Sequence, residues 1–260
     1  MCHALILPMN TYEYQGQKLT YLHFGEGETA FIWAHGWGHN HHAFEQIAKS
    51  LSFMGQHYVI DFPGFGGSPK PDDVWSVQDY ADFMIAFIQS IQAKKVVWIG
   101  HSFGCRVGLR IAAATKLIAK MILISAAGIP RKRGLLEQVS LTLRVRFFKM
   151  LKIFVRSEEG RDKLRARFGS ADYKNAAELR AIFLKTIQDD VTDILPNIKC
   201  PVSLIYGAKD RETPPEIGIR LNKAITKAQL EILPDFDHYT ILTDGKNILS
   251  HKIKNFVEAK

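Results

Sequence analysis

The chain has 260 residues, of which 47% are hydrophobic and 23% are charged, and its formal net charge at pH 7 is +8. This composition excludes a disordered, collagen-like or coiled-coil protein, and the length is enough for one α/β domain with a sizeable core. No apolar run is long enough for a membrane span. The first ten residues lack the basic stretch and the cleavage site of a signal peptide, so we expect none.

Short apolar runs alternate with segments of helical spacing along the first half of the chain. Glycine-bounded apolar runs are typical of buried strands, and apolar residues three and four positions apart indicate helices. Because strands that alternate with helices run parallel and are joined by crossovers, we expect an α/β sheet covered on both faces. The predicted strands are 10–15, 18–24, 30–34, 57–61, 96–100 and 121–125, and the predicted helices are 42–53, 77–91 and 103 to about 115.

The alternation stops at about residue 129. Helical spacing dominates from there to 195, with no strand evident. The sheet needs further strands to complete its core, so we interpret 129–195 as a helical cap inserted into a core made of 1–128 and 196–260. The alternation resumes with strands at 201–207 and 229–233 and helices near 215–226 and 245–258.

The positive charge is concentrated in this insertion. Residues 129–168 hold 12 Lys or Arg and 4 Asp or Glu, and therefore the whole surplus of +8. Apolar and basic residues interleave over 135–156, which predicts a cationic amphipathic helix. It is a lid with solvated charges, or it contacts an anionic substrate or carrier, or it lies on an anionic membrane surface. No nucleic-acid-binding motif accompanies the charge, so we expect no nucleic-acid partner.

Residues 100–104 (GHSFG) lie between a predicted strand and a predicted helix. A G-x-S-x-G sequence there is typical of a nucleophile elbow, in which glycines relieve crowding around a strained serine, here Ser102. The alternative is an ordinary glycine-rich turn. An oxyanion hole would use the backbone N–H of Phe103 and a second one from the loop after an earlier strand, where Trp37 lies. Trp37 could instead be a core residue of a plain turn.

Two polar residues follow the last two predicted strands. Asp210 comes after strand 201–207 and His238 after strand 229–233. Open α/β sheets place their sites at the carboxyl ends of strands, and the order Ser102, Asp210, His238 is that of a serine hydrolase triad on such a sheet. Asp61 and Glu212 are competing acids. We favour Asp210 and interpret Asp61 as structural.

Cofactor and metal sites are not expected. The turn at 61–68 lacks the ending of a phosphate-binding loop. His35, His39, His41 and His42 cluster along the chain, but no H-E-x-x-H motif accompanies them, so we predict no metal.

Cys2, Cys105 and Cys200 are an odd number of cysteines in a chain too large to need disulfides. A reducing, cytoplasmic compartment is therefore expected. Cys105 follows the GHSFG motif directly, and we interpret it as a buried, inert thiol.

Taken together, HGWG (35–38), DFPGFGGS (61–68), GHSFG (100–104), YGAKDRETP (206–214) and DFDH (235–238) resemble the α/β-hydrolase family over nearly the whole chain. The resemblance is greatest to carboxylesterases, hydrolases of acyl-carrier esters and carbon–carbon bond hydrolases. It implies an eight-stranded, mostly parallel sheet with a helical cap after the sixth strand. Ser102 argues against the dehalogenase and epoxide hydrolase members, which use Asp there. Cys105 stands where many members have glycine.

These observations predict a serine esterase that acts on a small-molecule acyl substrate, and the basic segment adds an anionic or carrier-linked substrate as an alternative. Ser102 is the nucleophile, His238 the base, Asp210 the acid, and Trp37 and Phe103 form the oxyanion hole. The alternatives are hydrolysis of a carbon–carbon bond in a vinylogous keto acid, a slow-turnover ligand-binding module, and a protein that docks on a membrane or carrier.

Overall fold

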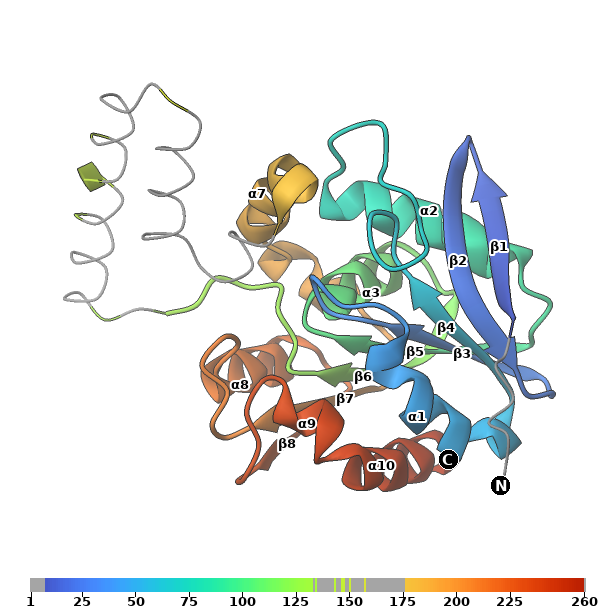
Figure 1. Ribbon diagram of the computed structural model, residues 1–260. Coiled ribbons are helices and arrows are strands. Elements are labelled where there is room, and N and C mark those ends of the chain that lie inside the picture. Colours follow the sequence, from blue (N-terminus) through green and yellow to red (C-terminus); the bar gives the residue numbers. More distant parts are fainter. Residues whose placement is uncertain are drawn as a thin grey trace.

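The computed structural model describes residues 8–132, 134, 143, 146, 147, 150, 157 and 176–259, which build an eight-stranded sheet (Figure 1). The strand order is β1-β2-β4-β3-β5-β6-β7-β8; β2 is antiparallel to both neighbours and the other pairs are parallel. This is the predicted mostly parallel sheet. Its strands are β1 Met9–Tyr14, β2 Gln17–Phe24, β3 Thr29–Ala34, β4 Gln56–Asp61, β5 Lys95–His101, β6 Ile118–Ile124, β7 Val202–Gly207 and β8 Ala228–Leu233.

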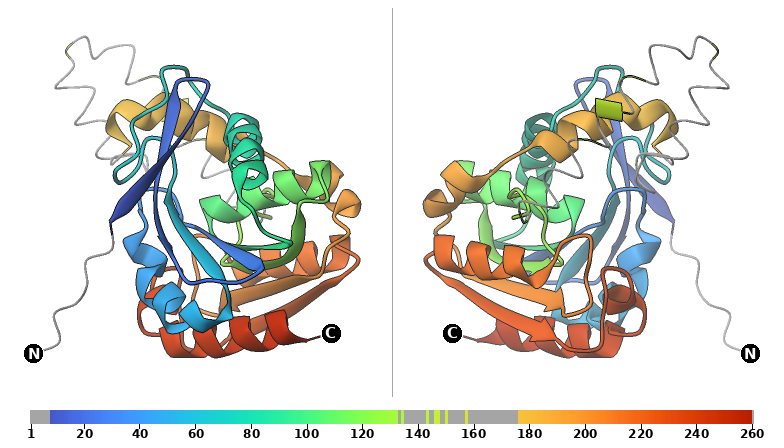
Figure 2. Two further views of the ribbon diagram at one scale, coloured as in Figure 1. Left: turned by 90° about the vertical axis from the view of Figure 1, so that its right-hand side faces the viewer. Right: turned by 90° about the vertical axis from the view of Figure 1, so that its left-hand side faces the viewer.

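Helices cover both faces of the sheet, as the sequence predicts. Along β3, Ala30 and Ile32 face one buried cluster with α2, α3 and α8, whereas Phe31 and Trp33 face the other with α1, α9 and α10. Figure 2 shows these two helical layers on opposite sides of the sheet. The helices are α1 His42–Ser50, α2 Val77–Ser90, α3 Phe103–Ala114, α7 Arg180–Gln188, α8 Pro215–Ala224, α9 Thr240–Thr243 and α10 Lys246–Glu258.

The elements differ from the predicted ones mainly at their ends. β6 begins at Ile118, earlier than the predicted 121, and the predicted helix 42–53 ends at Ser50 before a 3-10 turn at Ser52–Met54. The short α9 was not predicted. In contrast, α2 starts at the predicted residue because Ser76 and Asp79 form a capping box.

The chain between β6 and β7 includes the predicted cap. Its described end contains α7 and 3-10 turns at Ala177–Leu179 and Thr192–Asn197. The Val191 N–H donates to the Gly128 carbonyl at 2.9 Å, so the chain shortly after β6 meets the chain shortly before β7. The predicted amphipathic helix over 135–156 lies mostly outside the described residues. None of the helices in the described ranges is long and apolar enough to cross a membrane.

Candidate active site

Ser102 lies at the turn between β5 and α3, at the carboxyl end of a central strand (Figure 1). Its φ is 48° and its ψ is −104°, a positive φ that only a few of the described non-glycine residues have. A side chain held in such a conformation is strained and needs the surrounding structure to maintain it. The Ser102 N–H donates to the Ile124 carbonyl at 3.1 Å, which ties the turn to β6.

Two glycines make this turn possible. A Cβ on Gly100 would lie 2.9 Å from the backbone nitrogen of Cys105, and a Cβ on Gly104 would lie 2.1 Å from the Ala34 carbonyl oxygen. The Gly104 N–H instead donates to the His35 carbonyl at 3.1 Å. The tight strand-to-helix turn predicted from the GHSFG motif is therefore present, with Cys105 fully buried beneath it.

Asp210 and His238 are in direct contact on the loops after β7 and β8. His238 Nδ1 lies 2.8 Å from Asp210 Oδ2, and both residues are buried. The other carboxylate oxygen, Oδ1, accepts the N–H groups of Glu212 and Thr213 at 2.9 and 2.8 Å. With its second oxygen held by the backbone, the carboxylate presents a fixed oxygen to the imidazole.

The electrostatics keep the Asp210 carboxyl ionised. Burial raises its pKa, but the hydrogen bond and charge of His238 and the N–H of Thr213 outweigh burial, so the net pKa is below the usual value. A buried carboxylate at Nδ1 favours the imidazole tautomer with its proton on Nδ1. That tautomer leaves Nε2 free to accept a proton.

His101 connects the serine turn to the histidine loop. Its ring centroid is 4.7 Å from that of His238, and its Nε2 lies 2.9 Å from the His238 carbonyl oxygen. Burial lowers the pKa of His101 well below the usual value, so its ring is neutral. Ser102 follows His101 directly in the chain. Among the described residues Ser102 Oγ makes no hydrogen bond to His238, and such bonds are commonly long before substrate binds.

The predicted oxyanion donors lie beside Ser102. A Cβ on Gly36, the residue before Trp37, would be 3.4 Å from the Ser102 Cβ. Within the described chain, the backbone N–H groups of Trp37 and Phe103 donate to no protein acceptor. The Trp37 ring also packs edge-on against the Phe103 ring, with ring centroids 5.6 Å apart. The side chain of Trp37 is therefore packed, while its backbone N–H stays available.

A cavity of about 640 Å³ opens beside Trp37 and Tyr239, the neighbours of Gly36 and His238 in the chain; Ser102 and His238 themselves do not line it. Its wall combines aromatic and aliphatic surface from Trp37, Phe65 and Leu179 with the polar side chains of His39 and Lys70. Leu179 belongs to the described part of the chain between β6 and β7, so this segment borders the cavity.

The competing acids occupy other positions. Asp61 is fully buried and accepts hydrogen bonds from His41 and from the Gly67 N–H, which makes it a structural residue as predicted. Glu212 is exposed, and its backbone N–H rather than its side chain is hydrogen-bonded to Asp210.

Thr213 is a site residue that the sequence reasoning missed. Its Oγ1 lies 2.9 Å from Asp210 Oδ2 and 3.1 Å from His238 Nδ1. An acid followed three residues later by threonine is the signal that could have identified it, because such pairs form local side-chain-to-backbone bonds.

Comparison with known proteins identifies the family of the chain. The sequence profile described as the alpha/beta hydrolase family matches residues 31–247, most of the chain. A pimeloyl-[acyl-carrier protein] methyl ester esterase of Vibrio parahaemolyticus is 26% identical over 255 residues, covering 90% of this chain and 96% of the relative.

Two solved structures share the fold. An esterase from Exiguobacterium antarcticum aligns with a TM-score of 0.72 at 21% identity, over 94% of this chain and 97% of that one. A meta-cleavage product hydrolase from Pseudomonas fluorescens aligns with a TM-score of 0.70 at 18% identity, over 96% and 98% of the two chains.

Proposed function

Because the chain belongs to the α/β-hydrolase family, we propose that it is a serine hydrolase that cleaves a carboxylic ester through an acyl-enzyme on Ser102. The observation that carries the proposal is the 2.8 Å contact of His238 Nδ1 with Asp210, on loops at the same sheet edge as the strained Ser102 turn. A serine, a base and an orienting acid at one edge are the parts that acyl transfer needs.

In the proposed reaction, Ser102 Oγ attacks the ester carbonyl carbon while His238 Nε2 takes the hydroxyl proton. The N–H groups of Trp37 and Phe103 bind the oxyanion, and losing one such donor typically costs on the order of 10² to 10³ in kcat. His238 then gives its proton to the leaving alcohol. Water attacks the acyl-enzyme with His238 as base, which releases the acid and restores Ser102. Asp210 stabilises the charged imidazole and stays ionised throughout.

The substrate class follows from the cavity and from the charge of the chain. A partly apolar space of about 640 Å³ beside Trp37 suits an acyl group of small to medium size. The relative named for a carrier-linked ester and the basic stretch 129–168 support an anionic or carrier-linked substrate. In this proposal 129–195 is a cap over the site, and no cofactor takes part.

The proposal is tested with a fluorophosphonate probe and a series of p-nitrophenyl esters from acetate to laurate. We expect the probe to label Ser102, located by peptide mass spectrometry, and the esters to show a chain-length optimum that measures the cavity. Asp210→Asn is the matched variant, because it keeps the side-chain size and removes the charge. It should slow both labelling and turnover.

Two other outcomes would replace the proposal. Labelling of Ser102 without turnover of any ester, together with cleavage of a ring-fission dienoate, would identify a carbon–carbon bond hydrolase. Neither labelling nor turnover, in a chain that still binds a ligand tightly, would identify a ligand-binding module.

A further inference from the structure

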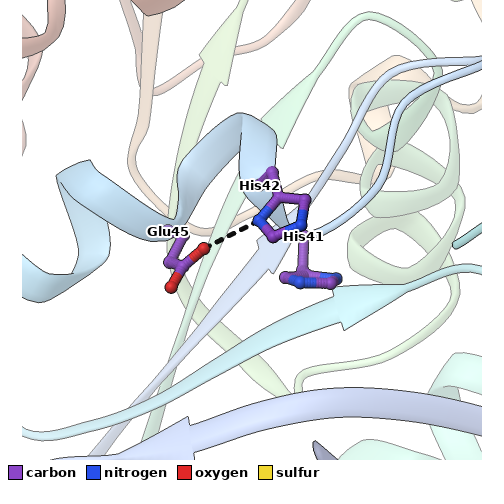
Figure 3. Close-up of side chains that lie close together, drawn as sticks. All are labelled: His41, His42 and Glu45. Atoms are coloured by element: carbon purple, nitrogen blue, oxygen red, sulfur yellow. Dashed lines mark hydrogen bonds and ion pairs between the residues drawn. The ribbon is translucent and has the colours of Figure 1, made fainter. Parts of the chain in front are cut away.

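His41, His42 and Glu45 form a second cluster of polar side chains at the start of α1 (Figure 3). One nitrogen or oxygen from each lies within 4.8 Å of the other two. The ring centroids of the two histidines are 4.0 Å apart, and His42 Nδ1 is 2.8 Å from Glu45 Oε2. Figure 3 shows the His42 ring facing the Glu45 carboxylate, with the His41 ring beneath them, seen edge-on.

A buried carboxylate orients the first of these histidines. Asp61, at the end of β4, is fully buried, and its two carboxylate oxygens lie 2.9 and 3.0 Å from His41 Nδ1. This contact favours a proton on Nδ1, which leaves the lone pair of Nε2 available. A carboxylate that holds the far nitrogen of an imidazole in this way is the usual outer partner of a metal-binding histidine.

The carboxylate of Glu45 is also held in place. Lys49 Nζ donates to Glu45 Oε1 at 2.7 Å, so Oε2 is the oxygen turned towards His42. The His42 side chain is 69% exposed and can rotate. In a tetrahedral zinc site with metal–ligand bonds of about 2 Å, the ligand atoms lie about 3.3 Å apart. The three ligand atoms lie within 4.8 Å of one another, so each pair must approach by at most about 1.5 Å to reach this spacing.

From this arrangement we infer that His41 Nε2, one ring nitrogen of His42 and Glu45 Oε2 bind a divalent transition-metal ion of the zinc class. Two imidazoles and one carboxylate suit zinc, whereas magnesium and calcium prefer oxygen ligands alone. Water completes the coordination on the exposed side. The inference is independent of the proposed esterase activity.

The inference departs from the prediction that the clustered histidines hold no metal. That prediction considered His35 and His39 together with His41 and His42. The structure separates the first two, because the His35 Nε2 accepts the Phe62 N–H at 3.0 Å and His39 packs against Tyr239. Glu45 and Asp61 complete the set, and neither belonged to the sequence cluster.

A bound ion would fasten the start of α1 to the turn after β4. Asp61 Oδ2 accepts the Gly67 N–H at 2.8 Å, so the ion, His41, Asp61 and this turn would form one connected unit. An ion that binds only the folded chain raises the unfolding temperature with its concentration. Stabilisation is therefore a second measure of binding, separate from catalysis.

The test is a zinc titration of untagged, chelator-treated full-length protein against a chromophoric competitor. We expect one equivalent to bind, and His42→Ala and Glu45→Gln each to weaken it at least tenfold. His251→Ala, at an exposed histidine on α10, is the matched control and should bind as the wild type does. Zinc should raise the unfolding temperature of the wild type and of His251→Ala, but not of His42→Ala.

The inference would be overturned if the wild-type protein bound no zinc when zinc and protein were mixed at equal concentrations of tens of micromolar. Equal affinity in His42→Ala, Glu45→Gln and the wild type would do the same, since it would assign the ion to other surface groups. Because His42 and Glu45 are on the outer side of α1, circular dichroism should show that both variants fold.

Discussion

Thr213 places one hydroxyl at the contact between Asp210 and His238. Its Oγ1 is also 3.0 Å from the Ser125 carbonyl oxygen, so the hydroxyl joins β6 to the acid–base pair. In the proposed mechanism it fixes the carboxylate rotamer and thereby the direction of the imidazole. Thr213 is then a positioning residue, because it acts through Asp210 and His238.

We predict that Thr213→Val lowers kcat on a p-nitrophenyl ester by about 10- to 100-fold, the worth of a hydrogen bond to a charged group. Thr213→Ser retains the hydroxyl and should keep most of the rate. The pH profile of kcat/KM should change in the valine variant and not in the serine variant. Wild-type kinetics in Thr213→Val would show that the hydroxyl only packs.

His57 is a buried histidine remote from the proposed chemistry. It stacks on Phe31 with ring centroids 4.7 Å apart, and its Nδ1 accepts the Trp33 indole N–H at 3.0 Å. Burial lowers its pKa from 6.5 to about 4. Between these values the unfolded chain binds a proton that the folded chain does not, so stability falls as the pH is lowered from 6.5 to 4.

The free energy of unfolding should therefore decrease by up to about 3 kcal/mol over this range on account of His57. In His57→Asn, whose side-chain oxygen can still accept from Trp33, the decrease should be smaller by that amount. Urea unfolding at several pH values measures it. His251→Asn, at an exposed position, should retain the wild-type dependence. If the free energy of unfolding of His57→Asn depended on pH as that of the wild type does, the effect could not be assigned to His57.

At the scale of elements, Gly104 decides how closely α3 approaches β3. A Cβ there would lie 2.1 Å from the Ala34 carbonyl oxygen, so Gly104→Ala forces helix and strand apart. We expect a loss of about 1–3 kcal/mol in stability, typical of overpacking, and a loss of turnover because Ser102 moves with the helix. Thermal unfolding and ester hydrolysis report the two effects.

Gly134→Ala is the control for this substitution, since a Cβ at Gly134 would meet none of the described residues within 4 Å. It should unfold at the wild-type temperature. If Gly104→Ala also unfolded at the wild-type temperature, the close approach of α3 to β3 would not be what maintains the strained turn at Ser102.

The order and type of most elements could be predicted because their signals are local. The apolar runs of β3, β5 and β7 are buried on both faces, and the capping box of α2 lies within four residues. Some of the missed features depend on distant contacts. Lys120 lies inside β6 while its ammonium group reaches the carbonyls of Phe256 and Val257 at the end of α10, which no local pattern indicates.

The same distinction applies to the candidate site. Ser102, Asp210 and His238 could be proposed because each follows a recognisable strand at one edge of a parallel sheet. The metal-binding cluster could not, because His41 depends on Asp61, and that contact exists only once β4 is paired with β3. The short α9 begins where Asp237 accepts the N–H groups of Tyr239 and Thr240, a capping contact within one turn that periodicity does not detect.

At the scale of the whole molecule, the net charge of +8 resides in residues 129–168, while the remainder is balanced. If this segment attracts an acidic carrier, the attraction is electrostatic and salt weakens it. The screening length falls from about 8 Å at physiological salt to about 3 Å at 1 M. The cytoplasmic location expected from the cysteine content stays a prediction.

We predict that KM for a carrier-linked ester rises steeply between 0.05 and 0.5 M salt, on the order of tenfold, while KM for a neutral p-nitrophenyl ester stays constant. Steady-state kinetics with both substrates on one preparation supply the comparison. Equal salt responses would mean that the basic segment does not recruit the substrate.

If Ser102 is the nucleophile, the hydrolysis of a p-nitrophenyl ester depends on it, and the comparison of Ser102→Ala with the wild type on one such ester measures that dependence. We expect the variant to keep its circular dichroism spectrum and unfolding temperature. Its kcat should fall by at least about 10³-fold, the usual effect of removing a triad member. A folded Ser102→Ala variant that retained most of the wild-type rate would show that Ser102 is not the nucleophile, because the observed hydrolysis would then not pass through an acyl-enzyme on Ser102.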